Sequence, residues 1–160
     1  MCGLAFAGKS TLARKIAKHT DSKLIAFDKL WAKKEKERPI SKDAKGWKFI
    51  RKVAKDKISK CLRRGTSAVY DDTNVRFEHR EELRKVAKEA DSDSVVIFLN
   101  TPLEVIEARE HVNRATGERH EVEPENFQIV LEQLEPPSSG ENVLEFKPNS
   151  NVEEFLKKLD

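Results

Sequence analysis

The sequence predicts an α/β fold, in which helices cover a parallel sheet. Short apolar runs alternate along the chain with amphipathic segments of helical periodicity, and this alternation is typical of βαβ units. The run SVVIFL at 94–99 is almost continuously apolar, as expected of a parallel strand buried on both faces. A glycine-rich loop at the start of the chain leads directly into the first amphipathic helix.

The alternation places each element along the chain. Helices are expected over 10–20, 29–37, 46–64 and about 77–90, with a further one starting at Pro124. Strands are expected over 24–27, 67–70, 94–99 and 143–146. Thr101 and Pro102 have the residue types preferred at the N-cap and first position of another helix. Only Met1 and Cys2 precede the glycine-rich loop, so either the strand before it is unusually short or further residues precede it.

Length and composition favour one compact domain over residues 1–160. Hydrophobic residues make up 38% and charged residues 37% of the chain, which is polar but includes clear apolar runs. No apolar run approaches the length of a membrane span and no secretory leader is visible, so we expect no membrane partner. Cys2 and Cys61 are too few for a disulfide framework and lack metal-ligand spacing, which favours a cytoplasmic protein.

The loop at 3–10 has the pattern G-x-x-x-x-G-K-S, which is typical of phosphate-binding P-loops. Its two glycines allow backbone N–H groups to turn toward phosphate oxygens with no Cβ in the way. Lys9 is expected to reach the β- and γ-phosphates, and the Ser10 hydroxyl to bind Mg²⁺. The helix that follows directs its N-terminus at the anion. The predicted nucleotide-binding residues are Gly3, Ala5, Phe6, Ala7, Gly8, Lys9, Ser10 and Thr11.

Acidic residues follow two of the expected strands. Asp28 ends the strand at 24–27, and Asp71 and Asp72 end the strand at 67–70. Ligands of open α/β sheets bind beyond the carboxyl ends of the strands, so these carboxylates are expected to face the γ-phosphate. A kinase needs a carboxylate to accept the proton of the acceptor hydroxyl, and acids or their bound waters around Mg²⁺. The alternative is that Asp28 and Asp72 only cap the helices that follow them.

A polar segment at about 110–124 is expected to form a small lid. Arginines on a mobile segment can fold over a triphosphate and stabilise the charge that develops during transfer. Arg109 and Arg114 are the predicted catalytic arginines, and Arg119 is a further candidate. The alternative is a surface loop with ordinary charges.

The net charge of +3 conceals a strong asymmetry. Residues 1–64 carry 20 Lys/Arg and 6 Asp/Glu, a balance of +14, and residues 65–160 carry 11 and 22, a balance of −11. The helix at 45–64 alone has nine Lys/Arg against Asp56. Such a helix either binds a polyanion or is a solvated face. Trp31 either stacks on a base or belongs to the core.

Five stretches carry a resemblance to a known family. They are GLAFAGKST at 3–11, LIAFD at 24–28, YDDTNVRFEHR at 70–80, FLNTPLEVIEAR at 98–109 and NRATGER at 113–119. Together they resemble the P-loop kinases related to polynucleotide 5′-hydroxyl kinase, zeta toxins and seryl-tRNA kinases, which are grouped as AAA-type ATP-binding kinases. The resemblance covers nearly the whole chain, and the D-T-N element at 72–74 is its most specific part beyond the P-loop.

The resemblance implies a three-layer P-loop NTPase fold, with a five-stranded parallel sheet of order 2-3-1-4-5, flanking helices and a lid. It implies that Lys9 and Ser10 bind phosphate and Mg²⁺ and that Asp28 is the general base. Asp72 is similar to the acid that binds the acceptor or metal-bound water. The matching lid arginines are Arg109 and Arg114. By analogy of fold, adenine is expected near the lid and residues 148–150.

Three functions stay open from the sequence alone. The first is an ATP-dependent kinase acting on a hydroxyl, with a nucleic acid acceptor favoured by the basic helix at 45–64. The second is a kinase of a small molecule such as a sugar, a nucleotide or an antibiotic. The third is a nucleotide switch that hydrolyses ATP slowly or not at all. ATP is favoured over GTP because the chain has no Asn-Lys-x-Asp element for reading guanine.

Overall fold

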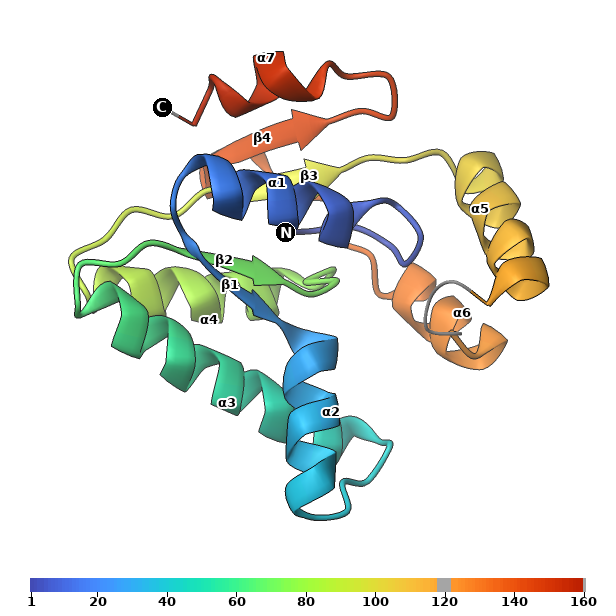
Figure 1. Cartoon of the computed structure of the whole chain (residues 1–160), viewed down its shortest axis with the longest axis horizontal. Helices are drawn as coiled ribbons and strands as arrows, with labels where there is room; N and C mark the ends of the chain where they lie inside the picture. The colour runs from blue at the N-terminus through green and yellow to red at the C-terminus, as the bar shows by residue number, and fades with distance from the viewer. Residues whose placement is uncertain (118–121, 160) are drawn as a thin grey trace.

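The computed structural model describes residues 1–117 and 122–159, in which helices and strands alternate (Figure 1). The strands are β1 Lys23–Ala26, β2 Ala68–Asp71, β3 Val96–Leu99 and β4 Val143–Phe146. The helices are α1 Lys9–His19, α2 Phe27–Glu37, α3 Ala44–Leu62, α4 Phe77–Lys88, α5 Leu103–Thr116, α6 Pro124–Glu132 and α7 Val152–Leu156, with the 3-10 turn η1 Ser139–Glu141. Within these ranges, no helix is long and apolar enough to cross a bilayer.

The strands form two parallel pairs, β1 with β2 and β3 with β4. Residues 1–3 lie between the pairs. Cys2 bridges to Phe98, and its N–H donates to the carbonyl of Ile97 at 2.8 Å. On the other side, the Gly3 N–H donates to the carbonyl of Thr73 at 3.0 Å. The two pairs are therefore joined by a segment too short to be a regular strand, and the P-loop begins where this segment ends.

Helices cover both faces of β1 and β2. α1 packs on one face, and α3 packs on the other with α4 beside it (Figure 1). Two separate apolar clusters fill these layers. The cluster under α1 includes Leu12, Ile16, Ile97, Leu99 and Ile106. The cluster under α3 includes Ile25, Leu30, Ile50, Ala54, Ile58 and Tyr70.

A buried ion pair fixes the loop that follows β2. Arg80 of α4 donates to Glu141 through Nε at 2.7 Å and Nη2 at 3.0 Å. Its Nη1 donates to the carbonyls of Asn74 at 3.1 Å and Val75 at 2.9 Å. The hydrogen bonds from Arg80 outweigh the effect of burial and lower the pKa of Glu141 to about 2. One guanidinium thus links η1 to the loop that carries the expected acid at position 72.

Two local expectations from the sequence are wrong. α2 begins at Phe27 rather than at 29, so Asp28 lies in the first turn of a helix and not at the end of a strand. Thr101 does not cap α5, because Pro102 is the N-cap residue. The Thr101 hydroxyl instead donates to the carbonyl of Ala7 in the P-loop at 3.2 Å, so it is already engaged elsewhere.

Candidate functional site

The P-loop has a curled backbone that requires glycine at two positions. Gly3 has φ 141° and Gly8 has φ 103°, both in the region that favours glycine. A Cβ at Gly3 would lie 2.9 Å from the carbonyl oxygen of Leu99. Phe6 also has a positive φ of 59°. No side chain caps the start of α1, so its first N–H groups are available to an anion in the loop.

The remaining predicted nucleotide-binding residues line the loop and the first turn of α1. Ala5 and Phe6 are partly buried, and Ala7 is buried. Ser10 and Thr11 are exposed in the first turn of α1, where a bound phosphate and its cation are expected.

Lys9 is buried with its ammonium group folded back into the loop. Its Nζ donates to the carbonyl of Leu4 at 2.7 Å. Burial lowers the pKa of Lys9, and the carboxylates of Asp71, Asp72 and Asp28 oppose that change. A phosphate bound in the loop would supply the anionic partner that a desolvated lysine favours.

Asp72 is held by donors on both carboxylate oxygens. Its Oδ1 accepts from the backbone N–H of Thr73 at 2.7 Å. Its Oδ2 accepts from the Tyr70 hydroxyl at 3.0 Å and from Nε of Arg51 at 3.4 Å. Burial and the Asp72 charge raise the pKa of Tyr70 far above its ordinary value, so the phenol stays protonated and remains a donor. Asp72 does not cap α4, because the N-cap of that helix is Arg76.

The other two acids that the sequence places at strand ends are Asp28 and Asp71. Asp28 is exposed in the first turn of α2, whose N-cap is Ala26. Asp71 is buried at the end of β2. The negative charges of both carboxylates, together with that of Asp72, stabilise the charged ammonium group of Lys9. The structure therefore brings all three acids within electrostatic reach of the P-loop lysine.

The predicted lid arginines differ in their positions. Arg109 of α5 donates through Nη1 to the carbonyl of Phe6 at 3.0 Å, so its guanidinium lies against the P-loop. Arg114 forms an ion pair with Glu110 at 2.5 Å, and 52% of its side chain is exposed. Arg119 lies outside the described residues. Of the two predicted lid arginines that lie within the described residues, Arg109 is therefore the one that contacts the P-loop.

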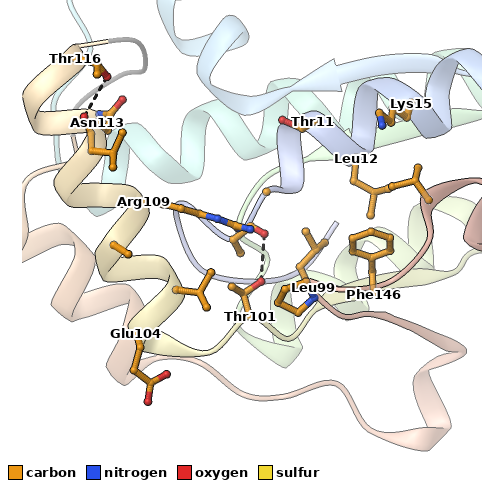
Figure 2. Close-up of a pocket in the computed structure, with 17 residues that line it drawn as sticks. Thr11, Leu12, Lys15, Leu99, Thr101, Glu104, Arg109, Asn113, Thr116 and Phe146 are labelled. Atoms are coloured by element: carbon orange, nitrogen blue, oxygen red, sulfur yellow. Dashed lines mark hydrogen bonds between the residues drawn. The ribbon is translucent and has the colours of Figure 1, made fainter.

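A pocket of about 700 Å³ opens beside the P-loop. Leu12 and Lys15 of α1 lie along one side, and Arg109 extends from α5 on the other side toward the loop (Figure 2). Pro148, in the segment expected to lie near adenine, contributes to the wall. Val112 of α5 also lines the pocket and is 58% exposed, an apolar side chain open to solvent. A concave, largely apolar pocket of this size suits a small organic ligand such as a nucleoside.

The sequence did not predict the contacts that several residues make in this region. Thr101 supports the P-loop, and Tyr70 and Arg51 hold Asp72. Tyr70 reads in the sequence as an ordinary strand residue, and Arg51 is one of many cations on α3. Nothing in the sequence marks Val112 as a pocket residue, because exposed apolar residues on helices are common. Only the folded arrangement shows what these side chains contact.

The oxygen donors near the P-loop fit Mg²⁺. Among the described residues, no group of three or more His, Cys, Asp or Glu side chains is arranged to hold a metal. Mg²⁺ in nucleotide sites needs only one or two protein oxygens, because phosphates and waters complete its shell. Ser10 offers an exposed hydroxyl and Asp72 a hydrogen-bonded carboxylate. These are the kind of ligands that such a site uses.

The basic helix α3 has one inward and one outward side. Ile50, Ala54 and Ile58 are buried against the sheet. Lys55, partly buried, pairs with Glu82 of α4 at 2.7 Å. The exposed cations of α3 are Lys45, Lys48, Lys52, Lys57 and Lys60. These five lysines, which we call the α3 lysine face, outnumber the single acid of the helix and make its outward side strongly positive.

Comparison with known proteins identifies the family. The sequence model of the family described as AAA domain matches residues 1–137. The chain belongs to this family. The P-loop at 3–10 and the acid-bearing loop after β2 both lie in the matched region, which confirms the resemblance to P-loop kinases drawn from the motifs.

Individual relatives agree with this assignment. The chain is 32% identical over 107 residues to an L-seryl-tRNA(Sec) kinase of Methanococcus maripaludis, an alignment that covers 66% of this chain and 42% of the relative. The alignment thus spans less than half of that relative's length. The solved structure of Kti12 of Chaetomium thermophilum with ADP-AlF3 matches with a TM-score of 0.77 and 19% identity, covering 99% and 94% of the two chains.

A second solved structure has the same fold. The APS kinase CysC of Mycobacterium tuberculosis, in complex with AMPPNP and APS, matches with a TM-score of 0.71 and 16% identity, covering 99% of this chain and 91% of the other. At this identity the likeness concerns the fold alone. The α/β architecture predicted from the sequence is therefore that of the P-loop kinases.

Proposed function

We propose that this protein is an ATP-dependent kinase that transfers the γ-phosphoryl group of ATP to a hydroxyl of a nucleic acid. The observation that carries the proposal is the grouping of the buried Lys9 ammonium with the three carboxylates of Asp28, Asp71 and Asp72 beside a P-loop. A P-loop lysine needs no such set of acids to bind a nucleotide. Transfer to an alcohol does need a carboxylate near the γ-phosphate.

The roles follow from position. The nucleoside enters the 700 Å³ pocket between α1 and α5, and the phosphates lie in the P-loop against Lys9. The acceptor oxygen attacks the γ-phosphorus, the bond to the β-phosphate oxygen breaks, and ADP leaves. Asp28 takes the proton of the acceptor hydroxyl, and its exposure at the start of α2 leaves it accessible to that hydroxyl.

Mg²⁺ would be held by Ser10 and, through water, by Asp72, and when bound it neutralises charge on the phosphates. Arg109 stabilises charge on the transferring group, since its guanidinium already contacts the P-loop. Arg114 pairs with Glu110 on the surface, so it acts only if the lid at 110–124 moves. The lid is part of a single kinase domain over residues 1–160.

We assign residues 1–3 as the central strand of a five-stranded sheet of order 2-3-1-4-5. Hydrogen bonds of this segment on both sides, to Ile97 and to Thr73, support that order. In chain order, β1, β2, β3 and β4 are then the second to fifth strands, and helices on both faces make three layers. The free thiols of Cys2 and Cys61 support a cytoplasmic location.

A nucleic acid acceptor is supported by charge. The α3 lysine face is a sequence-independent attraction for phosphodiesters, and α3 also carries the Arg51 side chain that reaches Asp72. The name of the M. maripaludis relative, a kinase of an aminoacyl-tRNA, is consistent with an acceptor attached to RNA.

A small-molecule acceptor is the second candidate, because the solved structure of the APS kinase holds APS together with a nucleotide. A nucleotide switch is the third, and it would use the P-loop and pocket without the acids.

The test is phosphate transfer from γ-labelled ATP to 5′-hydroxyl RNA and DNA oligonucleotides, bulk tRNA and a no-acceptor control. Labelled nucleic acid, formed with a KM that rises steeply with salt, is expected. Replacing two lysines of the α3 lysine face, Lys48→Gln and Lys52→Gln, should raise that KM and reduce its salt dependence. ATP binding with no labelled nucleic acid would contradict the nucleic acid acceptor and favour one of the alternatives.

A further inference from the structure

Arg51 is the one cation of α3 that contacts an acid of the candidate site among the described residues. Its Nε lies 3.4 Å from Oδ2 of Asp72, a long contact for a charged pair. Its guanidinium carbon lies 5.8 Å from the ring centroid of Phe27, the residue before Asp28. The side chain is 23% exposed. Arg51 is therefore positioned next to both elements that carry the proposed acceptor-binding acids.

Asp72 does not depend on Arg51 for its hydrogen bonds. Tyr70 donates to Oδ2 at 3.0 Å and the Thr73 N–H to Oδ1 at 2.7 Å, and both contacts are shorter than that of Arg51. In the part of the chain that the structure describes, the two terminal nitrogens of Arg51 make no hydrogen bond. A guanidinium needs partners for these donors, and their planar fork matches an oxyanion.

Arg51 also lines a cavity of about 10 Å³ with Lys55, Tyr70, Asn74, His79, Glu82 and Leu83, and this volume holds at most about one water. An anion bound by the terminal nitrogens of Arg51 must therefore lie outside this cavity, where the side chain is open to solvent. The three acids near Lys9 repel an anionic acceptor, and the positive charge of Arg51 offsets this repulsion.

We infer that Arg51 is a specificity-determining residue that binds an anionic group of the acceptor next to the reacting hydroxyl. The class of acceptor is a hydroxyl compound with a phosphate or phosphodiester a few ångströms from the hydroxyl that is phosphorylated. The inference rests on the proposed function and deepens it. It attributes to Arg51 the recognition of one anionic group next to the reacting hydroxyl. The α3 lysine face, in contrast, attracts phosphodiesters at any position.

The experiment compares two acceptors in the γ-labelled ATP transfer assay. One is a 5′-hydroxyl oligonucleotide, and the other is the same oligonucleotide with a neutral methylphosphonate at its first linkage. The wild-type protein should show a KM about 10- to 100-fold higher for the neutral acceptor. Arg51→Gln should raise the KM for the charged acceptor by a similar factor and lose the discrimination. Arg51→Lys should restore only part of it, because the fork is lost.

Lys52→Gln is the matched control, since Lys52 is the next residue of α3 and is exposed. As a member of the α3 lysine face, Lys52 acts on both acceptors alike, so Lys52→Gln should raise the KM for both by the same factor and keep the discrimination between them. Equal discrimination by Arg51→Gln and the wild-type protein would overturn the inference and leave the kinase intact. A loss of kcat that is the same for both acceptors would also overturn it, because Arg51 would then only position Asp72. A wild-type protein that labels neither acceptor would overturn the proposed function together with the inference.

Discussion

The substitution Glu141→Gln removes the charge that compensates Arg80 in a buried pair. Both side chains are nearly inaccessible, with 2% of Arg80 and 3% of Glu141 exposed. The introduced amide could still accept one hydrogen bond, but Arg80 would keep a buried charge without a full counter-ion. Breaking one side of such a pair typically costs about 3–5 kcal/mol of folding free energy. For a chain of this length, that cost lowers the unfolding temperature by about 6–20 °C.

The pH dependence of unfolding gives an independent measure of how much the Arg80–Glu141 pair stabilises the fold. The pKa of Glu141 is lowered from 4.5 to about 2, which corresponds to about 3 kcal/mol of stabilisation. Because the folded-state pKa is the lower one, this contribution is complete above the ordinary pKa of Glu and is lost as pH falls toward 2. The difference in stability between the wild-type protein and Glu141→Gln should therefore be constant above about pH 5.5 and shrink as the pH falls from about 4.5 to 2.

The assay is thermal or urea unfolding of both proteins over this pH range. Glu107→Gln is the matched control, because Glu107 is exposed on α5 and forms no ion pair within the described residues. It should change stability by less than about 0.5 kcal/mol. If Glu141→Gln unfolds within about 2 °C (~1 kcal/mol) of the control at pH 7, the Arg80–Glu141 pair does not stabilise the fold as argued.

Three further predictions concern nucleotide binding, measured by calorimetric titration with ATP. Lys9→Ala should weaken ATP binding by about 10- to 100-fold, since it removes the charged donor of the loop, and an unchanged affinity would contradict the P-loop assignment. Gly3→Ala should abolish ATP binding, because its Cβ would meet the Leu99 carbonyl at 2.9 Å in a backbone of φ 141°; normal binding would show that the loop relaxes. Val112→Glu should weaken ATP binding but leave inorganic triphosphate binding unchanged, and equal effects on both would argue against a nucleoside in the pocket.

The alternation of apolar runs and amphipathic segments was enough to predict an α/β fold. Apolar runs and helical periodicity placed the four strands and the helices between them within a few residues, since burial on both faces leaves a clear mark on a strand. The boundary at Asp28 was wrong because Phe27 continues an apolar run and yet opens α2. Helix starts without a side-chain cap leave little trace in the sequence.

Site residues could be predicted where they belong to a recognisable local motif, and not where their role depends on contacts made only in the folded chain. The P-loop glycines are required by backbone geometry, so their spacing identifies them. Arg51 and Tyr70 act on Asp72 across 21 and 2 positions of the chain, and no local pattern distinguishes Arg51 from the other cations of α3. Arg109 was predicted as a lid residue, and its contact with the Phe6 carbonyl depends on how α5 packs.

We propose that this P-loop serves phosphate transfer with Asp28 as the base. The most direct measurement is single-turnover transfer from γ-labelled ATP to a 5′-hydroxyl oligonucleotide by the wild-type protein and by Asp28→Asn, at concentrations that saturate both with ATP. The wild-type protein should transfer the label, and Asp28→Asn should bind ATP nearly normally but transfer at least about 100-fold more slowly. Equal transfer rates for the two proteins would contradict the assignment of Asp28 as the base.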